Sequence, residues 1–151
     1  TILDDTHDFL DQINIRNPQS REAQKLIALI HATDHMQRLH ERCDEDLNRA
    51  IAASQRHELT EVEIVMDSQI DEIIDAVEAQ QLERACELAE QSYQRTLGME
   101  DPQREKIYQA VARGEFDIRY ATESAEALRW LTRVSRHVSR ICHYLYKAQQ
   151  Q

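Results

Sequence analysis

Apolar residues recur every three or four positions along most of this chain, and that spacing is typical of amphipathic α-helices. The clearest run lies in the last third, where consecutive apolar positions are separated by three or four residues throughout. Its members are Ala121, Ala125, Leu128, Leu131, Val134, Val138, Ile141, Leu145 and Ala148. The run forms a narrow apolar seam, so we expect one long helix that lies against neighbouring helices in a bundle.

The first third of the chain predicts two helices separated by a break. Residues 1–13 form a short amphipathic segment, and Pro18 then disfavours helix in the residue before it. Ser20 is a suitable N-cap for the next helix. From Ser20 the apolar spacing continues for about 35 residues, which corresponds to a helix of about 50 Å.

A further helix is predicted to begin near Thr60. Thr60 followed by Glu63 has the form of a capping box, which marks a helix start. The pattern leaves open whether the chain bends or runs straight through residues 54–59. A turn is expected at Gln80 and Gln81, where the apolar spacing is interrupted.

Glycine and proline signals divide the region after this turn into two helices. Gly98 is expected to cap the end of the first one. The second is expected to begin with Asp101 as its cap and Pro102 in its first turn, and to end at Gly114.

The composition supports the helical interpretation. Among 151 residues there are only two glycines and two prolines, while good helix formers such as Ala, Leu, Glu, Gln and Arg are abundant. Runs of β-branched and aromatic residues, which are typical of strands, are absent. We therefore expect a single all-α domain, an up-down bundle of long antiparallel helices joined by short turns.

The charge is acidic overall and unevenly distributed. The formal net charge of −10 argues against general binding to nucleic acid, which requires a basic surface. Residues 1–103 contain 23 acidic and 9 basic side chains, and residues 104–151 contain the remaining 5 of 28 acidic and 9 of 18 basic ones. The last helix is therefore basic, and charge complementarity within the bundle is the simplest explanation.

Neither the cysteines nor the hydropathy indicate secretion or a membrane span. The three cysteines, Cys43, Cys86 and Cys142, are too widely spaced for a disulfide framework, so reduced thiols in a cytosolic setting are expected. The longest apolar run, Leu26–Ile30, is too short to cross a membrane, and no signal peptide is visible. The chain begins without Met, which leads us to expect a soluble piece of a longer protein.

The segment "IHATDHMQRLHERC" raises the question of a metal site. In a helix, His31, Asp34 and His35 lie on one side because their spacing is i, i+3 and i+4. Their nitrogen and oxygen atoms would suit zinc or iron. The alternative is a partly exposed, histidine-rich helix face that holds no metal.

A weak internal repeat relates this segment to the last helix. "LIHATDHMQRL" (29–39) aligns with "LTRVSRHVSRI" (131–141) at a constant offset of 102 residues. The alignment places His35 opposite His137 and Arg38 opposite Arg140. We therefore expect the segments around His35 and His137 to be equivalent across a pseudo-twofold axis and to meet in the bundle.

At these two segments the chain resembles the PhoU-like domains, which are tandem three-helix repeats. "RWLTRVSRHVSRICHYL" is similar to the last helix in the branch of that family that is fused to sodium/phosphate cotransporters, and "VARGEFD" resembles the linker before it. The similarity is good over residues 108–145 and fair over 26–42. It implies a PhoU-like fold in which residues 1–55 end a first repeat and residues 56–151 form most of a second.

The resemblance also implies a metal-binding pattern, E/D-x-x-x-D in the third helix of each repeat, which this chain does not keep. The corresponding positions are Ile30 and Asp34 in the first repeat and Thr132 and Arg136 in the second. Three of the four carboxylates are replaced, and a guanidinium offers a metal no lone pair. Because Asp34 and Arg136 occupy equivalent positions, we expect that they could face each other as a charge-assisted ion pair.

Two charged surfaces are further candidates for binding a partner or an ion. Four arginines of the last helix could contact an acidic protein, anionic lipid headgroups or the acidic part of the bundle itself: Arg129, Arg133, Arg136 and Arg140. Asp67, Asp71 and Asp75 share a helix face, where a solvated acidic stripe is favoured over a cation site. Trp130, beside the seam, is expected to pack in the core or at an interface.

The resemblance implies a regulatory, non-catalytic domain at the cytoplasmic face of the inner membrane. Such a domain would modulate sodium-dependent phosphate uptake by contacting the transmembrane region of its own transporter chain or a partner, and a homodimer stays open. One rival is a free-standing metal-binding carboxylate and histidine bundle, which usually contains Glu-x-x-His, a pattern that is absent here. Another rival is a plain oligomerisation bundle.

Overall fold

The computed structural model describes the whole chain, residues 1–151, and contains helices but no strand. The expected all-α bundle is therefore confirmed. In chain order its elements are α1 (Ile2–Asp11), α2 (Arg21–Glu45), α3 (Leu47–Gln55), the 3₁₀ turn η1 (His57–Leu59), α4 (Thr60–Glu78), α5 (Leu82–Ala112) and α6 (Ile118–Gln149).

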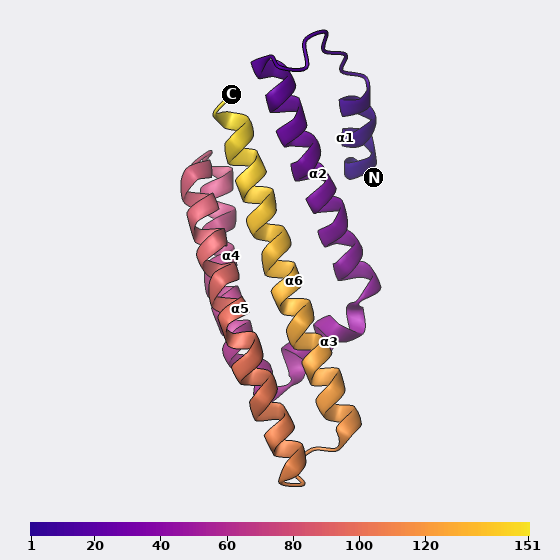
Figure 1. Cartoon of the computed structure of the whole chain (residues 1–151), viewed down its shortest axis with the longest axis vertical. Helices are drawn as coiled ribbons and strands as arrows, with labels where there is room; N and C mark the ends of the chain where they lie inside the picture. Colours follow the sequence, from indigo (N-terminus) through magenta and orange to yellow (C-terminus); the bar gives the residue numbers. More distant parts are fainter.

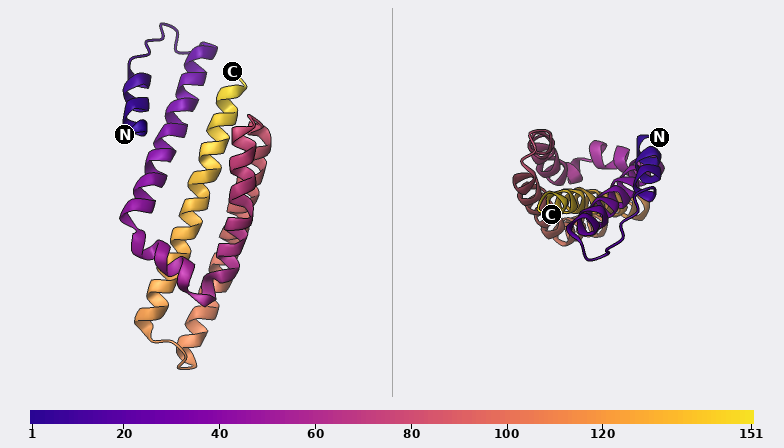
Figure 2. Two further views of the ribbon diagram at one scale, coloured as in Figure 1. Left: turned by 180° about the vertical axis from the view of Figure 1, so that it is seen from behind. Right: turned by 90° about the horizontal axis from the view of Figure 1, so that it is seen from above.

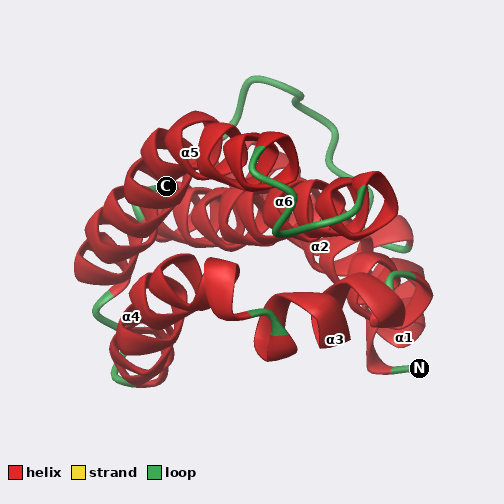
Figure 3. Ribbon diagram, turned by 90° about the horizontal axis from the view of Figure 1, so that it is seen from below, coloured by secondary structure: helices red, strands yellow, loops and turns green.

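Helix α6 is the central element of the bundle (Figure 1). It packs along α5 on one side and along α2 on the other, and it is antiparallel to both. Helix α4 packs mainly on α5, and α1 packs on α2 at the outer edge. In the view from behind (Figure 2, left), α3 crosses over α6. Figure 3 shows that α3 and α4 lie on the same side of the layer formed by α2, α6 and α5. The other side of α6 is not covered by a helix.

The long helix predicted after Ser20 is shorter than expected. Ser20 caps α2 as predicted, since its hydroxyl accepts a hydrogen bond of 3.1 Å from a backbone N–H three residues later. However, α2 ends at Glu45 and α3 starts in a new direction, so the prediction of one helix of about 35 residues is wrong. Three consecutive acids, Asp44–Asp46, oppose the helix dipole at this end. Trp130 also donates a hydrogen bond of 3.1 Å to the carbonyl oxygen of Arg42 in the last turn.

The chain bends between α3 and α4 rather than running straight through. Helix α3 ends at Gln55, and Arg56 has an extended ψ of 117° before the turn η1. Helix α4 begins at Thr60 as predicted, but its N-cap is Leu59 and no side chain caps it. The capping box expected from Thr60 and Glu63 is absent because Thr60 is already helical, with φ −55° and ψ −40°.

Helix α5 runs without a break, so the predicted helix end at Gly98 and restart at Asp101 and Pro102 are wrong. Its buried face continues at helical spacing from Ala85 to Ala110 and packs on α6. Packing along this whole face overrides the local proline signal. A proline ring crowds the carbonyl four residues earlier, and here that residue is glycine, whose backbone tolerates distortion.

The turns on either side of α5 form where they were predicted. Gln80 adopts a φ of 58° between α4 and α5, and Gly114 adopts a φ of 74° between α5 and α6. The positive φ favours glycine at the second turn. Asp117 then caps α6, with its carboxylate accepting a hydrogen bond of 2.7 Å from the Tyr120 backbone N–H. The long final helix is confirmed.

The apolar core follows α6 in two clusters. The larger cluster has its biggest fully buried side chains on η1, α4, α5 and α6, namely Leu59, Val62, Ile107 and Leu128. The smaller cluster joins α4, α5 and α6 through Ile73, Ala76, Ala85, Ala89 and Cys142. Small side chains dominate the buried positions, which lets the helices approach closely. None of the helices combines the length and the apolar character that crossing a membrane requires.

Arg56 ties the bend between α3 and α4 to the start of α6. Its guanidinium donates hydrogen bonds of 2.7 Å to the Tyr120 carbonyl oxygen, the Ser124 hydroxyl and the Glu123 carboxylate. It also lies 4.0 Å from the centroid of the Tyr120 ring. Glu58 accepts a hydrogen bond of 2.7 Å from the Ser124 hydroxyl. This network fixes the position of α3 across α6.

Replacing Arg56 by alanine should lower the free energy of unfolding by about 2–3 kcal/mol, because charge-assisted hydrogen bonds at a mostly buried side chain are lost together. Urea unfolding followed by circular dichroism measures the change. Arg119→Ala is a matched control, since Arg119 contacts the same Glu123 carboxylate but is 89% exposed. It should cost less than about 1 kcal/mol. Equal losses for both variants would show that the network does not hold the bend.

Candidate functional site

The contact between α2 and α6 centres on two histidines. His35 Nδ1 and His137 Nδ1 lie 3.1 Å apart, and their ring centroids are 5.4 Å apart. The two residues are separated by 102 positions, which is the offset of the internal repeat, and their helices run antiparallel (Figure 1). The expected meeting of the two segments is therefore confirmed.

Tyr144 extends this contact into an aromatic stack. Its ring stacks on His31 at a centroid distance of 4.6 Å and on His35 at 5.8 Å. His143 meets the same ring edge-on at 5.1 Å. Tyr144 was not among the residues predicted for the site, although it lies seven positions after His137 and so on the same helix face.

The geometry and burial of the histidine pair favour uncharged imidazole rings. A hydrogen bond between two Nδ1 atoms needs one N–H donor and one acceptor, so the rings must carry different tautomers or share one proton. Burial lowers the pKa of His35, against an opposing effect of Asp34. Burial also lowers the pKa of His137, and His35 and nearby guanidinium groups lower it further. Two charged rings would place two N–H groups against each other.

The three residues predicted to bind a metal do not converge on one point. His31 and His35 face aromatic rings of α6, whereas Asp34 turns to an arginine on its own helix. Of the other positions given by the resemblance, Ile30 is exposed, and Thr132 is buried with its hydroxyl donating within α6. Nowhere in the chain do three or more His, Cys, Asp or Glu side chains form a group that could hold a metal ion.

Asp34 does form an ion pair, but its partner is not Arg136. Its carboxylate accepts a hydrogen bond of 3.0 Å from Nε of Arg38, one turn further along α2. Arg136 is exposed and forms no ion pair. The physical reason is that His137 faces α2, and neighbouring helix residues differ by about 100° in direction. Arg136 therefore points to solvent.

An exposed basic row runs along α6. We call it the arginine row, and it consists of Arg129, Arg133, Arg136 and Arg140, continued by His143 and Lys147. The spacing of four, three, four, three and four residues places all six side chains on one helix face. All are exposed and none forms an ion pair. The charge complementarity expected within the bundle therefore does not neutralise this row through ion pairs.

Comparisons of the chain with protein-family models, with curated proteins and with solved structures find no match. The resemblance to PhoU-like domains thus depends on the residues of the two repeat segments. What the structure contributes is the geometry of the histidine pair and of the arginine row.

The lowered pKa values of His35 and His137 predict a pH-dependent stability. Because the folded state holds protons on these rings less tightly than the unfolded chain, it binds fewer protons once the pH falls below the ordinary histidine value near 6.5. Their contribution to the free energy of unfolding is therefore complete above about pH 7 and is lost as the pH falls through 6.5 and below. His137→Gln removes one of the two titrations and should make this loss smaller.

Urea unfolding at about pH 7.5, 6.5 and 5.5 measures the loss for each protein. His40→Gln is the control, because His40 is an exposed histidine on the same α2 helix and should leave the pH dependence as in the wild type. If His137→Gln loses as much stability between the two pH extremes as the wild type does, the histidine pair is not the titrating element.

Proposed function

We propose that this chain is a regulatory, non-catalytic PhoU-like domain that acts at the cytoplasmic face of a membrane on a sodium-dependent phosphate transporter. The observation that carries the proposal is the antiparallel contact of α2 and α6 at His35 and His137. These helices contain the two segments that resemble the third helix of a PhoU-like repeat, and they meet at equivalent positions, as two related halves should.

The arginine row is the surface through which the domain would bind the membrane beside the transporter. Its four guanidinium groups are exposed and unpaired, on a chain whose net charge is −10. The cytoplasmic surface of a membrane is negative, and each basic side chain near it contributes about 1 kcal/mol of attraction. The domain would therefore turn the arginine row towards the membrane beside the transporter and its acidic α4 away from it.

A catalytic role has little chemical support in this arrangement. Cys142 is the buried cysteine, and burial raises the pKa of its thiol to about 11, which disfavours the thiolate that nucleophilic catalysis needs. The two close histidines contact each other, and His35 also stacks on Tyr144. These contacts support a role in holding two helices together.

Vesicle binding tests the arginine row. The chain should sediment with vesicles that contain about 30% anionic lipid and not with neutral vesicles, and added salt should release it. Arg133→Gln with Arg136→Gln should weaken binding about tenfold or more. Arg84→Gln with Arg95→Gln removes the same charge from exposed positions on α5 and should have a much smaller effect. Equal weakening by both pairs would assign the binding to net charge rather than to the row.

Phosphate uptake in the native cells tests the transporter assignment itself. Deleting the segment that encodes residues 1–151 should change sodium-dependent uptake of radiolabelled phosphate and leave uptake without sodium unchanged. Replacing the four arginines of the arginine row by glutamine in the native gene should reproduce the direction of that change. Unaltered uptake in the deletion strain would refute the proposed function.

A further inference from the structure

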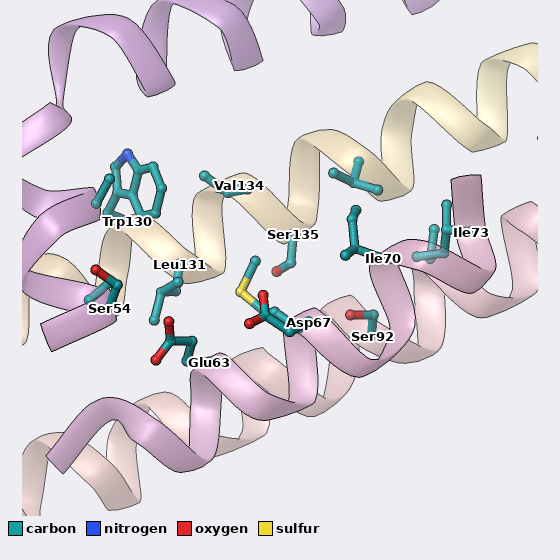
Figure 4. A pocket seen from close by; sticks show the side chains of 15 residues that line it. Ser54, Glu63, Asp67, Ile70, Ile73, Ser92, Trp130, Leu131, Val134 and Ser135 are labelled. Carbon is teal, nitrogen blue, oxygen red and sulfur yellow. The ribbon is translucent and has the colours of Figure 1, made fainter. Parts of the chain in front are cut away.

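On the side of α6 opposite the arginine row, the structure contains an apolar groove that no element fills. The groove has a volume of about 270 Å³ and lies between α3, α4 and α6, with α5 beneath it (Figure 4). Its apolar lining comes mainly from Met66, Ile70, Trp130, Leu131, Val134 and Val138. Helices α4 and α6 are both in contact with α5 but touch each other little, and this leaves the groove between them.

The shape of the groove fits a helix. On α4 its lining residues run from Glu63 to Ile73 at helical spacing, and on α6 they run from Trp130 to Val138. Ten residues of helix measure about 15 Å, so three turns of a further helix would fit alongside. The apolar face of α4 continues past the groove to Ile74, which is 47% exposed. A docked helix would complete a four-helix bundle with α4, α5 and α6.

The groove is bordered by unneutralised negative charge. Helix α4 contains seven carboxylates and no lysine, arginine or histidine. None of the seven forms an ion pair or a side-chain hydrogen bond within the chain: Glu61, Glu63, Asp67, Asp71, Glu72, Asp75 and Glu78. Two of them line the groove, and Figure 4 shows the side chains of Glu63 and Asp67 pointing into the space between α4 and α6.

The basic residues of the chain do not neutralise this border. Val138 lines the groove and Arg140 follows it by two positions, a rotation of about 200°, so the arginine row points to the opposite side of α6. Arg49 on α3 is already paired with Asp46 and Glu126. Arg56 is likewise committed to the network at the start of α6. The carboxylates of α4 therefore have no positive partner within the chain, and a basic partner molecule would supply one.

From the apolar lining, the helix-sized length and the acidic border we infer that this groove binds a basic amphipathic helix of a partner protein. Its leucine-like residues, spaced at i, i+3, i+4 and i+7, would occupy the apolar lining. Lysine or arginine residues on one flank would lie against Glu63 and Asp67. An anionic membrane or a nucleic acid is a poorer occupant, because the carboxylates of α4 would repel its phosphates. The inference does not depend on the transporter assignment.

Trp130 provides a built-in reporter for this binding, since it lines the groove and is the single tryptophan of the chain. The probe is a capped 14-residue peptide without aromatic residues, with leucines at i, i+3, i+4 and i+7 and lysines on one flank. Its twin has glutamate in place of every lysine. The basic peptide should shift the emission of Trp130, gain helix by circular dichroism, and bind about tenfold or more tightly than the twin.

Two pairs of substitutions on α4 locate the binding. Glu63→Gln with Asp67→Asn removes two charges at the groove, and Glu61→Gln with Glu72→Gln removes two charges from the opposite face of the same helix. The first pair should weaken binding of the basic peptide about fivefold, and the second should change it less than about twofold. All four positions are polar and at least partly exposed, so both variants should keep the wild-type melting temperature.

Several results would overturn the inference. One is that the emission of Trp130 does not change when the basic peptide is added. Another is that the acidic twin binds with the same affinity, and a third is that the two pairs of substitutions weaken binding equally. A dimer in sedimentation, with Trp130 already shielded, would assign the groove to a second copy of this chain. A shift of Trp130 emission with anionic vesicles in place of the peptide would assign it to a membrane.

Discussion

The close packing of α6 between α2 and α5 is the constraint on which the rest of this structure depends. Small buried residues such as Ala125, Ala127 and Ser135 let the helices approach, and Leu128 and Leu131 fill the remaining space. Because α6 is held on two opposite sides, its two remaining sides are fixed as well. One of them is covered only in part by α3 and α4, and the other is open.

This arrangement separates the charges of the molecule. The open side of α6 presents the arginine row, while α4 presents its carboxylates on the side of the groove. The two surfaces carry charges of opposite sign and face opposite directions. The arginine row could therefore bind a negative surface while the groove beside α4 binds a positive helix, without competition between them. A net charge of −10 alone would suggest only repulsion from negative partners.

The histidine contact joins two helices directly, whereas the sequence suggested a metal site at this place. The proposed PhoU-like relationship would imply metal-binding carboxylates on these two helices, whereas here two imidazoles join the helices directly at 3.1 Å. Such a contact needs no ion, but it needs one Nδ1 atom to carry a proton and the other to accept it, so the two rings cannot both be charged. Asp34 is consequently free to pair with Arg38 on its own helix.

The periodicity of apolar residues determined the class of the fold, the extent of α6 and the turns at Gln80 and Gly114, because these follow from local geometry. The offset of the repeat also placed His35 opposite His137. The sequence did not determine that α5 continues through Pro102, since packing on α6 outweighs a local signal, or that α2 ends at Glu45. The pairing of Asp34 with Arg38 is local, since the two residues lie one turn apart on the same helix. That Arg136 points away from α2, and that a groove lies beside α4, were decided by tertiary structure, because both depend on the rotation of helices about their axes and on the gaps left between them.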